Sequence, residues 1–554
     1  MDFEQILSKA RTGRTCPDGD ISMTVRVSGA PEQAVAVFKV LKGGVAEGRM
    51  KARVFLAGSF GCYDLEPIVS ISKQGRPTLL YGKVTPAEVS ELVDGYLVNG
   101  RMMPDRALCS MGEGGFDAIP RASDLPFFNL QNRIALRNCG LTDPGDIDHY
   151  LGCAQGYSGL SKAVQMDPAD VIGALQASGL IGSDGCRIAD KLQALYDAGD
   201  DEKYVVCNGV DSDPRSRTAR LLLEGDPHAV LEGLLIAAYA VGARRCIIAA
   251  DSRWAEGIRT THKALEGMRP YGLAGDNILD SVFSCEVEIR QTAPSLVTGE
   301  ETALLRFLEG REAMAAFRPP FPEVLRFLGK PGLVDTIETF AKASAIFQNA
   351  PACFAGLTAD GSRETRIITL SGDVKHPYTV EVPLFTTIRT LVEDIGGGVA
   401  VGGHIKAVQL GGPAGSFLGP DALDLPIESA SIVQTGSAMG STTIEVFDTE
   451  HCAVEMTEER MAYLQTQSCG KCVFCREGTL QMSDILRSLV GEGGTPQDLD
   501  LLCELGEAMR TGCICAIGWT AANPVLSSIG LFREDYEGHI KEKKCKSGPP
   551  RSFE

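Results

Sequence analysis

The sequence lacks any long apolar run. No stretch of about 20 apolar residues, the length that a membrane-spanning helix needs, occurs in it. The strongest candidate, LLIAAYAVGA, is followed directly by Arg244 and Arg245. The first residues, MDFEQILSKARTGR, lack the apolar segment of a signal peptide. We therefore expect a cytoplasmic protein with no segment inserted in a membrane.

Positive charge is also scarce. The 53 Lys and Arg are outnumbered by 72 Asp and Glu, which gives a formal net charge of −19. A nucleic-acid-binding surface needs clustered Lys and Arg, so no nucleic-acid partner is expected. The seven histidines show no ligand spacing, and DIGGGVAVG lacks the Lys-Ser/Thr of a phosphate-binding P-loop. Glu300 and Glu301 are adjacent, and adjacent side chains on a helix point in different directions.

Cysteine, by contrast, is present in a dense cluster. Most of the 18 cysteines are isolated, but Cys469, Cys472 and Cys475 form C-x2-C-x2-C in SCGKCVFCREGT. In a reducing compartment such clusters usually bind metal. A cubane [4Fe-4S] cluster takes one thiolate on each iron, and a short loop can supply three of the four. For the fourth, TGCICAIG offers Cys515, with Cys513 as a competitor.

The spacing favours iron–sulfur over zinc. A zinc site with four cysteines typically pairs two separate C-x2-C hairpins, which three cysteines in seven residues fit less well. The residues through DILRSLV predict a helix whose positive N-terminal end points toward the thiolates. Lys471 and Arg476 add positive charge beside them. A structural zinc site is the alternative.

The length predicts three or four domains, and the patterns are those of a multidomain α/β protein. Short strand-like runs come first, with a helix that starts at a capping box of Thr85 and Glu88. KYVVCNGV and RRCIIAAD then predict parallel buried strands joined by the helix PHAVLEGLLIAAYAVG. A small α+β region and a helical region follow. The predicted boundaries are 1–110, 111–350, 351–447, 448–545 and a polar tail at 546–554.

These motifs resemble a known family. SCGKCVFCREGT followed by CAIGWTAANPVLSSIGLFREDYEGHI is similar to the end of the NADH-binding flavoprotein (51 kDa-type) subunit of respiratory complex I. That subunit type also occurs in NAD-linked hydrogenases, formate dehydrogenases and electron-bifurcating complexes. GDNIL, TGEETALLRFLEG, RPPFP and GGPAGSFL follow the family's order, so the resemblance covers roughly 130–545.

The resemblance implies a domain for each part of the chain. It implies a Rossmann-like FMN/NAD-type domain, a β-grasp (SLBB) domain and a helical [4Fe-4S] domain, with Cys515 as the fourth cluster ligand. Residues 1–110 resemble a thioredoxin-like ferredoxin domain, which in the family holds a [2Fe-2S] cluster on four cysteines. RVSGAPEQAVAV has no cysteine, and AGSFGCYDLEP has only Cys62. This domain is therefore interpreted as degenerate, and no [2Fe-2S] cluster is expected.

The loop that binds the FMN phosphate in the family is altered here. This chain has GLIGSDGCRIADK, in which Asp184, Arg187 and Lys191 replace glycines of the family. Asp184 brings an anion toward a phosphate, and two like charges about 4 Å apart cost roughly 4 kcal/mol at an effective dielectric of about 20. The alternative is a rewired pocket in which Arg187 or Lys191 binds the phosphate.

Other pocket positions are only partly retained. Leu296, Ile188 and Thr336 replace a tyrosine, an aromatic residue and an asparagine of the family. Changes confined to ligand-facing loops indicate a scaffold that has lost its nucleotide. If FMN or NAD(H) is bound after all, the resemblance assigns the contacts to Gly182, Gly185, Asn208, Gly299, Glu300, Glu301 and Phe321.

We therefore expect an electron-transfer and docking subunit of a multi-subunit oxidoreductase. It would relay single electrons through one [4Fe-4S] cluster to other iron–sulfur or flavin subunits, and its own FMN/NADH site would be lost. One alternative is a divergent FMN-containing NADH dehydrogenase subunit that oxidises NADH or reduces NAD. Another is an architectural paralogue whose cluster is structural. The sequence names no catalytic residue.

Overall fold

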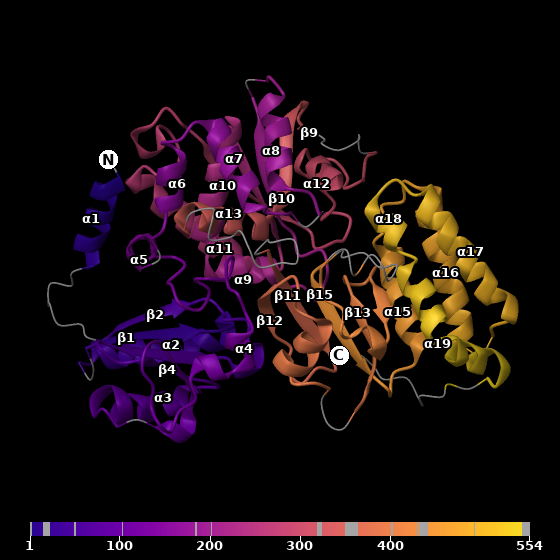
Figure 1. Cartoon of the computed structure of the whole chain (residues 1–554), viewed down its shortest axis with the longest axis horizontal. Helices are drawn as coiled ribbons and strands as arrows, with labels where there is room; N and C mark the ends of the chain where they lie inside the picture. Colours follow the sequence, from indigo (N-terminus) through magenta and orange to yellow (C-terminus); the bar gives the residue numbers. More distant parts are fainter. Residues whose placement is uncertain are drawn as a thin grey trace.

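The structure, a computed structural model, has three five-stranded sheets and a C-terminal group of helices among the residues it describes (Figure 1). The third sheet lies between the first sheet and the helices of the C-terminal part (Figure 1). The described residues are 3–14, 23–48, 51–101, 103–153, 155–182, 185–200, 202–317, 324–349, 364–399, 403–428, 432, 441–491, 493–543 and 545.

The first sheet has the strand order β2-β1-β3-β4-β5, with β1 and β2 parallel and the other pairs antiparallel. Its strands are β1 (Met23–Ser28), β2 (Arg53–Ala57), β3 (Ile68–Lys73), β4 (Thr78–Tyr81) and β5 (Ala107–Met111). Helices α2 (Pro31–Ala46) and α3 (Pro86–Leu92) accompany it. The predicted capping box is confirmed, because the Thr85 N–H donates to the Glu88 carboxylate at 2.8 Å.

The second sheet has the order β8-β7-β6-β10-β9, and only β9 runs antiparallel to its neighbour. Its strands are β6 (Tyr204–Gly209), β7 (Arg245–Asp251), β8 (Glu286–Thr292), β9 (Leu325–Phe327) and β10 (Lys330–Thr336). Its helices are α6 (Ser158–Ala163), α7 (Pro168–Ser178), α8 (Ile188–Asp197), α9 (Thr218–Gly225), α10 (Pro227–Val241), α11 (Ala255–Met268), α12 (Glu301–Leu308) and α13 (Ile337–Asn349). The predicted parallel strands β6 and β7 are confirmed.

Helix α10 is buried along almost its whole length because apolar residues surround it on every side. It begins at Asp226, whose carboxylate accepts the Ala229 N–H at 3.1 Å, and packs against α13. Helix α1 (Phe3–Arg14) also joins this core through Ile6 and Ala10, and contacts α5 (Ile147–Cys153).

The third sheet has the order β12-β11-β15-β13-β14, with β11 and β15 parallel. Its strands are β11 (Thr365–Gly372), β12 (Thr379–Pro383), β13 (Ile405–Leu410), β14 (Ser416–Leu418) and β15 (Thr443–Asp448). The helical segment Thr390–Ile395 buries Leu391, Val392 and Ile395 in the core of this sheet. Leu80 of β4 and Phe60, which follows β2, share a hydrophobic core with this sheet, so the first and third sheets pack against a common core.

The C-terminal part is helical, as the sequence predicts. Its helices are α15 (Ala453–Thr466), α16 (Val473–Val490), α17 (Pro496–Gly512), α18 (Ala516–Thr520) and α19 (Asn523–Lys541). Helix α19 packs on β14, where the Phe417 N–H donates to Ser527 Oγ at 2.9 Å. No helix among the described residues is long and apolar enough to cross a membrane.

Candidate metal centre and adjoining cleft

Three of the predicted cluster ligands lie on one short loop between α15 and α16. Gly470 has a φ of +75°, a conformation that favours glycine and turns the chain between Cys469 and Cys472. Cys472 is the residue that precedes α16, and Cys475 is buried in its first turn. The helix therefore presents its N-terminal end to the cysteine loop, where its dipole stabilises negative sulfur.

Hydrogen bonds hold this loop in place. Lys471 donates to the Ala315 carbonyl at 2.8 Å, and Arg476 donates to the Gly470 carbonyl at 2.7 Å. Both cations therefore brace the loop as well as adding positive charge near it. Ser468 Oγ lies 3.4 Å from the Cys475 sulfur, a contact that spacing alone did not predict.

The turn between α17 and α18 brings both candidate fourth ligands to this loop. Cys515 is the residue that precedes α18, and the N–H groups of Ile517 and Gly518 donate to its sulfur. Cys513 is buried against Cys475, with which its thiol shares a hydrogen bond. Distance alone therefore does not choose between them, but the helix N-terminus favours Cys515.

The local electrostatics separate these sulfurs further. The hydrogen bond from Cys513, helped by Ser468 and opposed by burial, lowers the pKa of Cys475 to about 6. The same bond raises the pKa of Cys513, which is thus the partner that keeps the proton. Burial raises the pKa of Cys515 to about 11, against the two backbone donors.

The arrangement of the sulfurs fits a cluster better than a single ion. Within the part of the chain that the structure describes, no three of these five cysteine sulfurs lie within 4.8 Å of one another. Two sulfurs on one tetrahedral zinc lie about 3.8 Å apart, whereas a cubane binds each thiolate on a different iron. Cysteine sulfurs at the N-termini of α16 and α18 therefore fit a [4Fe-4S] cluster.

A small cleft lies at the carboxyl ends of β6 and β10, where open α/β sheets usually bind ligands. Its volume is about 140 Å³, below the roughly 300 Å³ at which small-molecule pockets begin. Asp211 and Asp213 line it. Both carboxylates are used internally, since Ser216 Oγ donates to Asp211 and Ser441 Oγ donates to Asp213, each at 2.6 Å.

The retained pocket residues also form hydrogen bonds within the chain itself. Asn208 donates to the Gly299 carbonyl at 2.9 Å and accepts the Val210 N–H at 3.1 Å. A Cβ on Gly299 would lie 2.6 Å from the Cβ of Ser212, so the two loops close tightly. The Glu300 carboxylate accepts the Ala303 N–H at 2.9 Å as the N-cap of α12.

The described residues of the altered phosphate loop form hydrogen bonds with one another. The Gly182 N–H donates to the Cys186 carbonyl at 2.8 Å, and the Gly185 N–H donates to the Gly182 carbonyl at 3.1 Å. Both donors are therefore already committed. Arg187 is exposed at the start of α8. Ser183 and Asp184, like the predicted aromatic contact Phe321, lie outside the described residues.

Lys191 forms the contact that sequence reasoning missed. Its ammonium is nearly buried and lies 3.3 Å from the Glu301 carboxylate and 3.2 Å from that of Asp335. Glu301 is one of the residues assigned to the nucleotide, so an internal cation now neutralises it. The replacement of a glycine by lysine is visible in the sequence, but its partners lie more than a hundred positions away.

Comparison with known proteins finds two family models that match this chain. The family model described as NADH-ubiquinone oxidoreductase-F iron-sulfur binding region matches residues 455–539, and the Nuo51 FMN-binding domain matches residues 175–345. A crystal structure of an NAD+-reducing [NiFe]-hydrogenase in the H2-reduced state has the same fold. It aligns with a TM-score of 0.64 and 22% identity over 97% of this chain and 91% of that chain.

Two relatives are similar over most of their length. The NADP-reducing hydrogenase subunit HndC of Solidesulfovibrio fructosivorans is 38% identical over 75% of this chain and 85% of the relative. An NADH-quinone oxidoreductase subunit of Escherichia coli (strain K12) is 33% identical over 72% of this chain and 90% of the relative. The resemblance seen in the motifs is confirmed: the chain belongs to the family that contains this NADH-quinone oxidoreductase subunit and the hydrogenase subunit HndC.

Proposed function

We propose that this chain is an electron-transfer and docking subunit of a multi-subunit oxidoreductase. One [4Fe-4S] cluster on Cys469, Cys472, Cys475 and Cys515 would supply one-electron chemistry, as such clusters do. The observation that carries the proposal is the pairing of two helix N-termini around these thiols, next to a sheet edge whose cleft measures only about 140 Å³. The relatives' names, which denote subunits of a hydrogenase and a quinone oxidoreductase, support a multi-subunit setting.

The residues around the sulfurs would set the cluster's potential. Backbone donors at Cys515 and the Ser468 hydroxyl at Cys475 place hydrogen bonds on sulfur. Hydrogen bonds to sulfur and solvent exposure are the main protein controls on such potentials. The chain therefore contributes ligands, orientation and polarity, and the cluster contributes the redox change.

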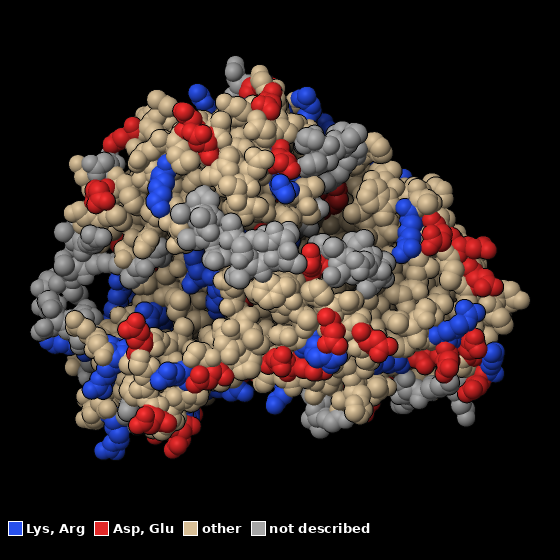
Figure 2. All heavy atoms as spheres, viewed as in Figure 1, with Lys and Arg blue, Asp and Glu red and all other residues tan. Residues whose placement is uncertain are grey.

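Exposed apolar side chains beside the cluster loop provide a docking surface. Val473 and Phe474 on α16 are 59% and 49% exposed, and Trp519 on α18 is 45% exposed. Large exposed aromatic side chains are typical of interface cores. We assign this surface to a partner iron–sulfur or flavin subunit that exchanges electrons with the cluster. On the face in Figure 2, by contrast, Lys and Arg of the described residues are interspersed with Asp and Glu.

We assign the parts of the chain as the sequence predicts them. Residues 1–110 are a degenerate thioredoxin-like domain, 111–350 the Rossmann-like FMN/NAD-type domain, 351–447 the β-grasp SLBB domain and 448–545 the helical cluster domain, with a tail at 546–554. The order and directions of the first sheet's strands support the first assignment. Cys62 is fully buried and burial raises its pKa, which supports a core thiol and not a [2Fe-2S] ligand.

We further propose that the chain's own FMN and NADH sites are lost. Three observations support this: the cleft is smaller than a ligand pocket, the glycine-loop donors Gly182 and Gly185 are used internally, and Lys191 neutralises Glu301. The residues present do not fit a flavin phosphate, so no step of the proposed function passes through FMN.

A second candidate function, a divergent FMN-containing NADH dehydrogenase subunit, is favoured by one observation. Residues 175–345 match the FMN-binding family model. Acid extraction of flavin from the purified full-length chain separates the two functions. Redox titration of the cluster separates a relay from an architectural paralogue, since a cluster that never changes state cannot carry electrons.

A further inference from the structure

The loop that precedes α12 is attached to the cysteine loop of the helical part. The Leu296 N–H donates to the side-chain carbonyl of Gln467 at 3.0 Å, two positions before Cys469. Leu296 also packs against the core of the helical part. Glu300 follows four positions later, as the N-cap of α12. These contacts therefore tie the segment that ends at Glu300 to the segment that carries the first cluster ligand.

A second set of hydrogen bonds links Glu300 itself to the cysteine loop. The Thr302 hydroxyl donates to the Glu300 carboxylate and accepts the Ala316 N–H at 2.8 Å. The carbonyl of the preceding residue, Ala315, accepts a hydrogen bond from Lys471 of the cysteine loop at 2.8 Å. The carboxylate is therefore held in a fixed place relative to the loop, through neighbours that are themselves hydrogen-bonded to it.

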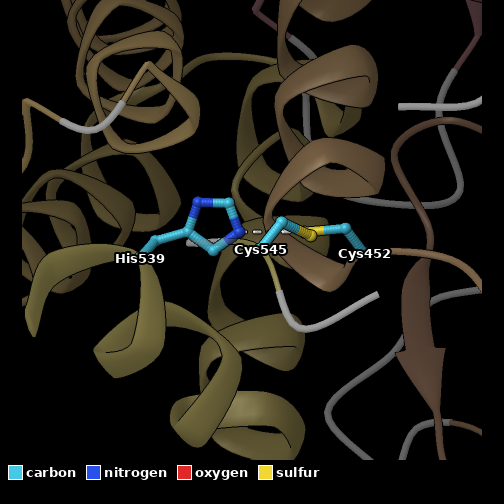
Figure 3. A group of neighbouring side chains, drawn as sticks. All are labelled: Cys452, His539 and Cys545. Carbon is cyan, nitrogen blue, oxygen red and sulfur yellow. Dashed lines mark hydrogen bonds between the residues drawn. The ribbon is translucent and has the colours of Figure 1, made fainter. Parts of the chain in front are cut away.

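The other end of α16 is fixed by different contacts. There the Leu489 carbonyl lies 3.2 Å from His539 Nδ1, and the Cys452 sulfur lies 3.2 Å from His539 Nε2. Figure 3 shows the imidazole edge directed at the Cys452 sulfur, with Cys545 beside them. Cys475 and Leu489 are 14 positions apart on α16, about 20 Å along its axis. The contacts in Figure 3 are therefore too distant to place the cysteine loop, which is positioned locally.

The charge of Glu300 also acts on the second ligand-bearing turn. Burial, and with it the Glu300 carboxylate, raise the pKa of Cys515. Glu300 is itself only partly exposed, and salt screens partly buried charges much less than exposed ones. Reduction of a cluster held by these thiolates adds one electron, so a fixed negative charge nearby opposes it.

We propose that Glu300 is a positioning residue of the iron–sulfur centre, whose negative charge lowers the reduction potential of the cluster. The inference rests on the proposed function, because it requires the [4Fe-4S] cluster on the four cysteines. A lower potential makes the reduced cluster a stronger one-electron donor to the partner subunit. A carboxylate that the resemblance assigns to a nucleotide thus serves the cluster in this chain.

Redox titration of the visible absorption of the cluster in the purified full-length chain tests the proposal. E300Q keeps an acceptor for the Ala303 N–H and removes the charge. At a fixed potential its ratio of reduced to oxidised cluster should rise about tenfold, an upward shift of about 59 mV for one electron. E300D keeps the charge and a favoured N-cap residue, so it should retain a potential close to that of wild type.

Two further variants keep the test decisive. E300A removes the same charge and should give the same upward shift, which answers the question if E300Q does not assemble its cluster. D498N is the matched control, because Asp498 caps α17 at the end remote from Cys513. It removes a carboxylate from a helix N-terminus and should leave the potential unchanged.

The outcomes separate this inference from the proposed function. A wild-type chain without iron would overturn both. An iron-loaded chain whose potential is the same in wild type, E300Q and E300A would overturn the role of Glu300 alone, as would an equal shift in E300D and E300Q, because loss of helix capping would then explain it.

Discussion

At the scale of single residues, two neighbouring cysteines have different surroundings. The Cys515 sulfur receives backbone N–H groups at the start of α18, whereas the Cys513 thiol is buried against Cys475 and its carbonyl accepts the Trp519 indole N–H at 2.6 Å. Backbone donors stabilise a thiolate, and burial without them favours a thiol. Of the two, Cys515 therefore has the backbone donors that support its proposed role as the fourth ligand.

Serine substitutions test this difference. C515S should lower the iron and sulfide content of the purified chain more than about tenfold, because a cluster ligand is removed. C513S should retain both at the wild-type level, since a hydroxyl can take its place against Cys475. Retention of iron in C515S together with its loss in C513S would assign the fourth ligand to Cys513.

Lys191 shows why the state of the nucleotide cleft could not be predicted from the sequence of the phosphate loop alone. The sequence predicts that Lys191 either disturbs a phosphate site or binds the phosphate. The structure gives it two carboxylate partners, Glu301 at the start of α12 and Asp335 on β10, the strand on which α8 packs. Removing one member of such a buried group leaves an uncompensated charge and typically lowers the free energy of unfolding by about 3–5 kcal/mol. The three side chains therefore stabilise one another in the folded chain.

At the scale of elements, the short helix α18 must approach the cysteine loop closely. A Cβ on Gly518 would lie 2.6 Å from the Cβ of Cys513 and 2.7 Å from its sulfur. No real Cβ tolerates such distances, so any side chain would push α18 away from Cys475. Glycine at this position therefore sets the spacing between the two ligand-bearing turns.

Alanine substitutions test that spacing. G518A should destabilise the chain by about 1–3 kcal/mol through overpacking and lower its iron content. G173A is the matched control, since it lies in helix α7 with nothing within 4 Å, and should stabilise by about 0.5–1 kcal/mol. Thermal unfolding and iron analysis measure both. Equal behaviour of the two variants would refute the role given to Gly518.

Elements were predictable where local signals were strong. The capping box at Thr85 and the apolar runs of β6 and β7 depend on neighbouring residues, and the structure confirms these elements. The pairing of Lys191 with Glu301 depends on sheet order, which no local pattern encodes. The same holds for Cys452 and His539, which lie 87 positions apart.

At the scale of the whole molecule, the segment after β2 of the first sheet contacts α9, a helix of the second sheet's domain. A Cβ on Gly58 would lie 2.2 Å from the Cα of Gly225 and 3.0 Å from the Glu224 carbonyl. The Glu224 side chain is 10% exposed there, and its carboxylate lies 3.3 Å from the Arg220 guanidinium. Burial, opposed by Arg220, raises the pKa of Glu224 to about 7.

This raised pKa predicts a pH dependence of stability. The folded chain binds the Glu224 proton more tightly than the unfolded chain, so its contribution is fully present below about pH 4.5 and is lost as the pH rises through 7. The loss amounts to about 3 kcal/mol. The difference in unfolding free energy between wild type and E224Q, measured from pH 5 to 8, should therefore change by that order. A flat difference would contradict the assignment.

We propose that this chain keeps an iron–sulfur relay after losing its nucleotide. Iron, sulfide and flavin content of the isolated full-length protein, determined on one sample, tests it most directly. We predict about four irons and four sulfides per chain with no FMN above trace. Stoichiometric FMN whose absorption is bleached by NADH, or a colourless chain without iron, would contradict it.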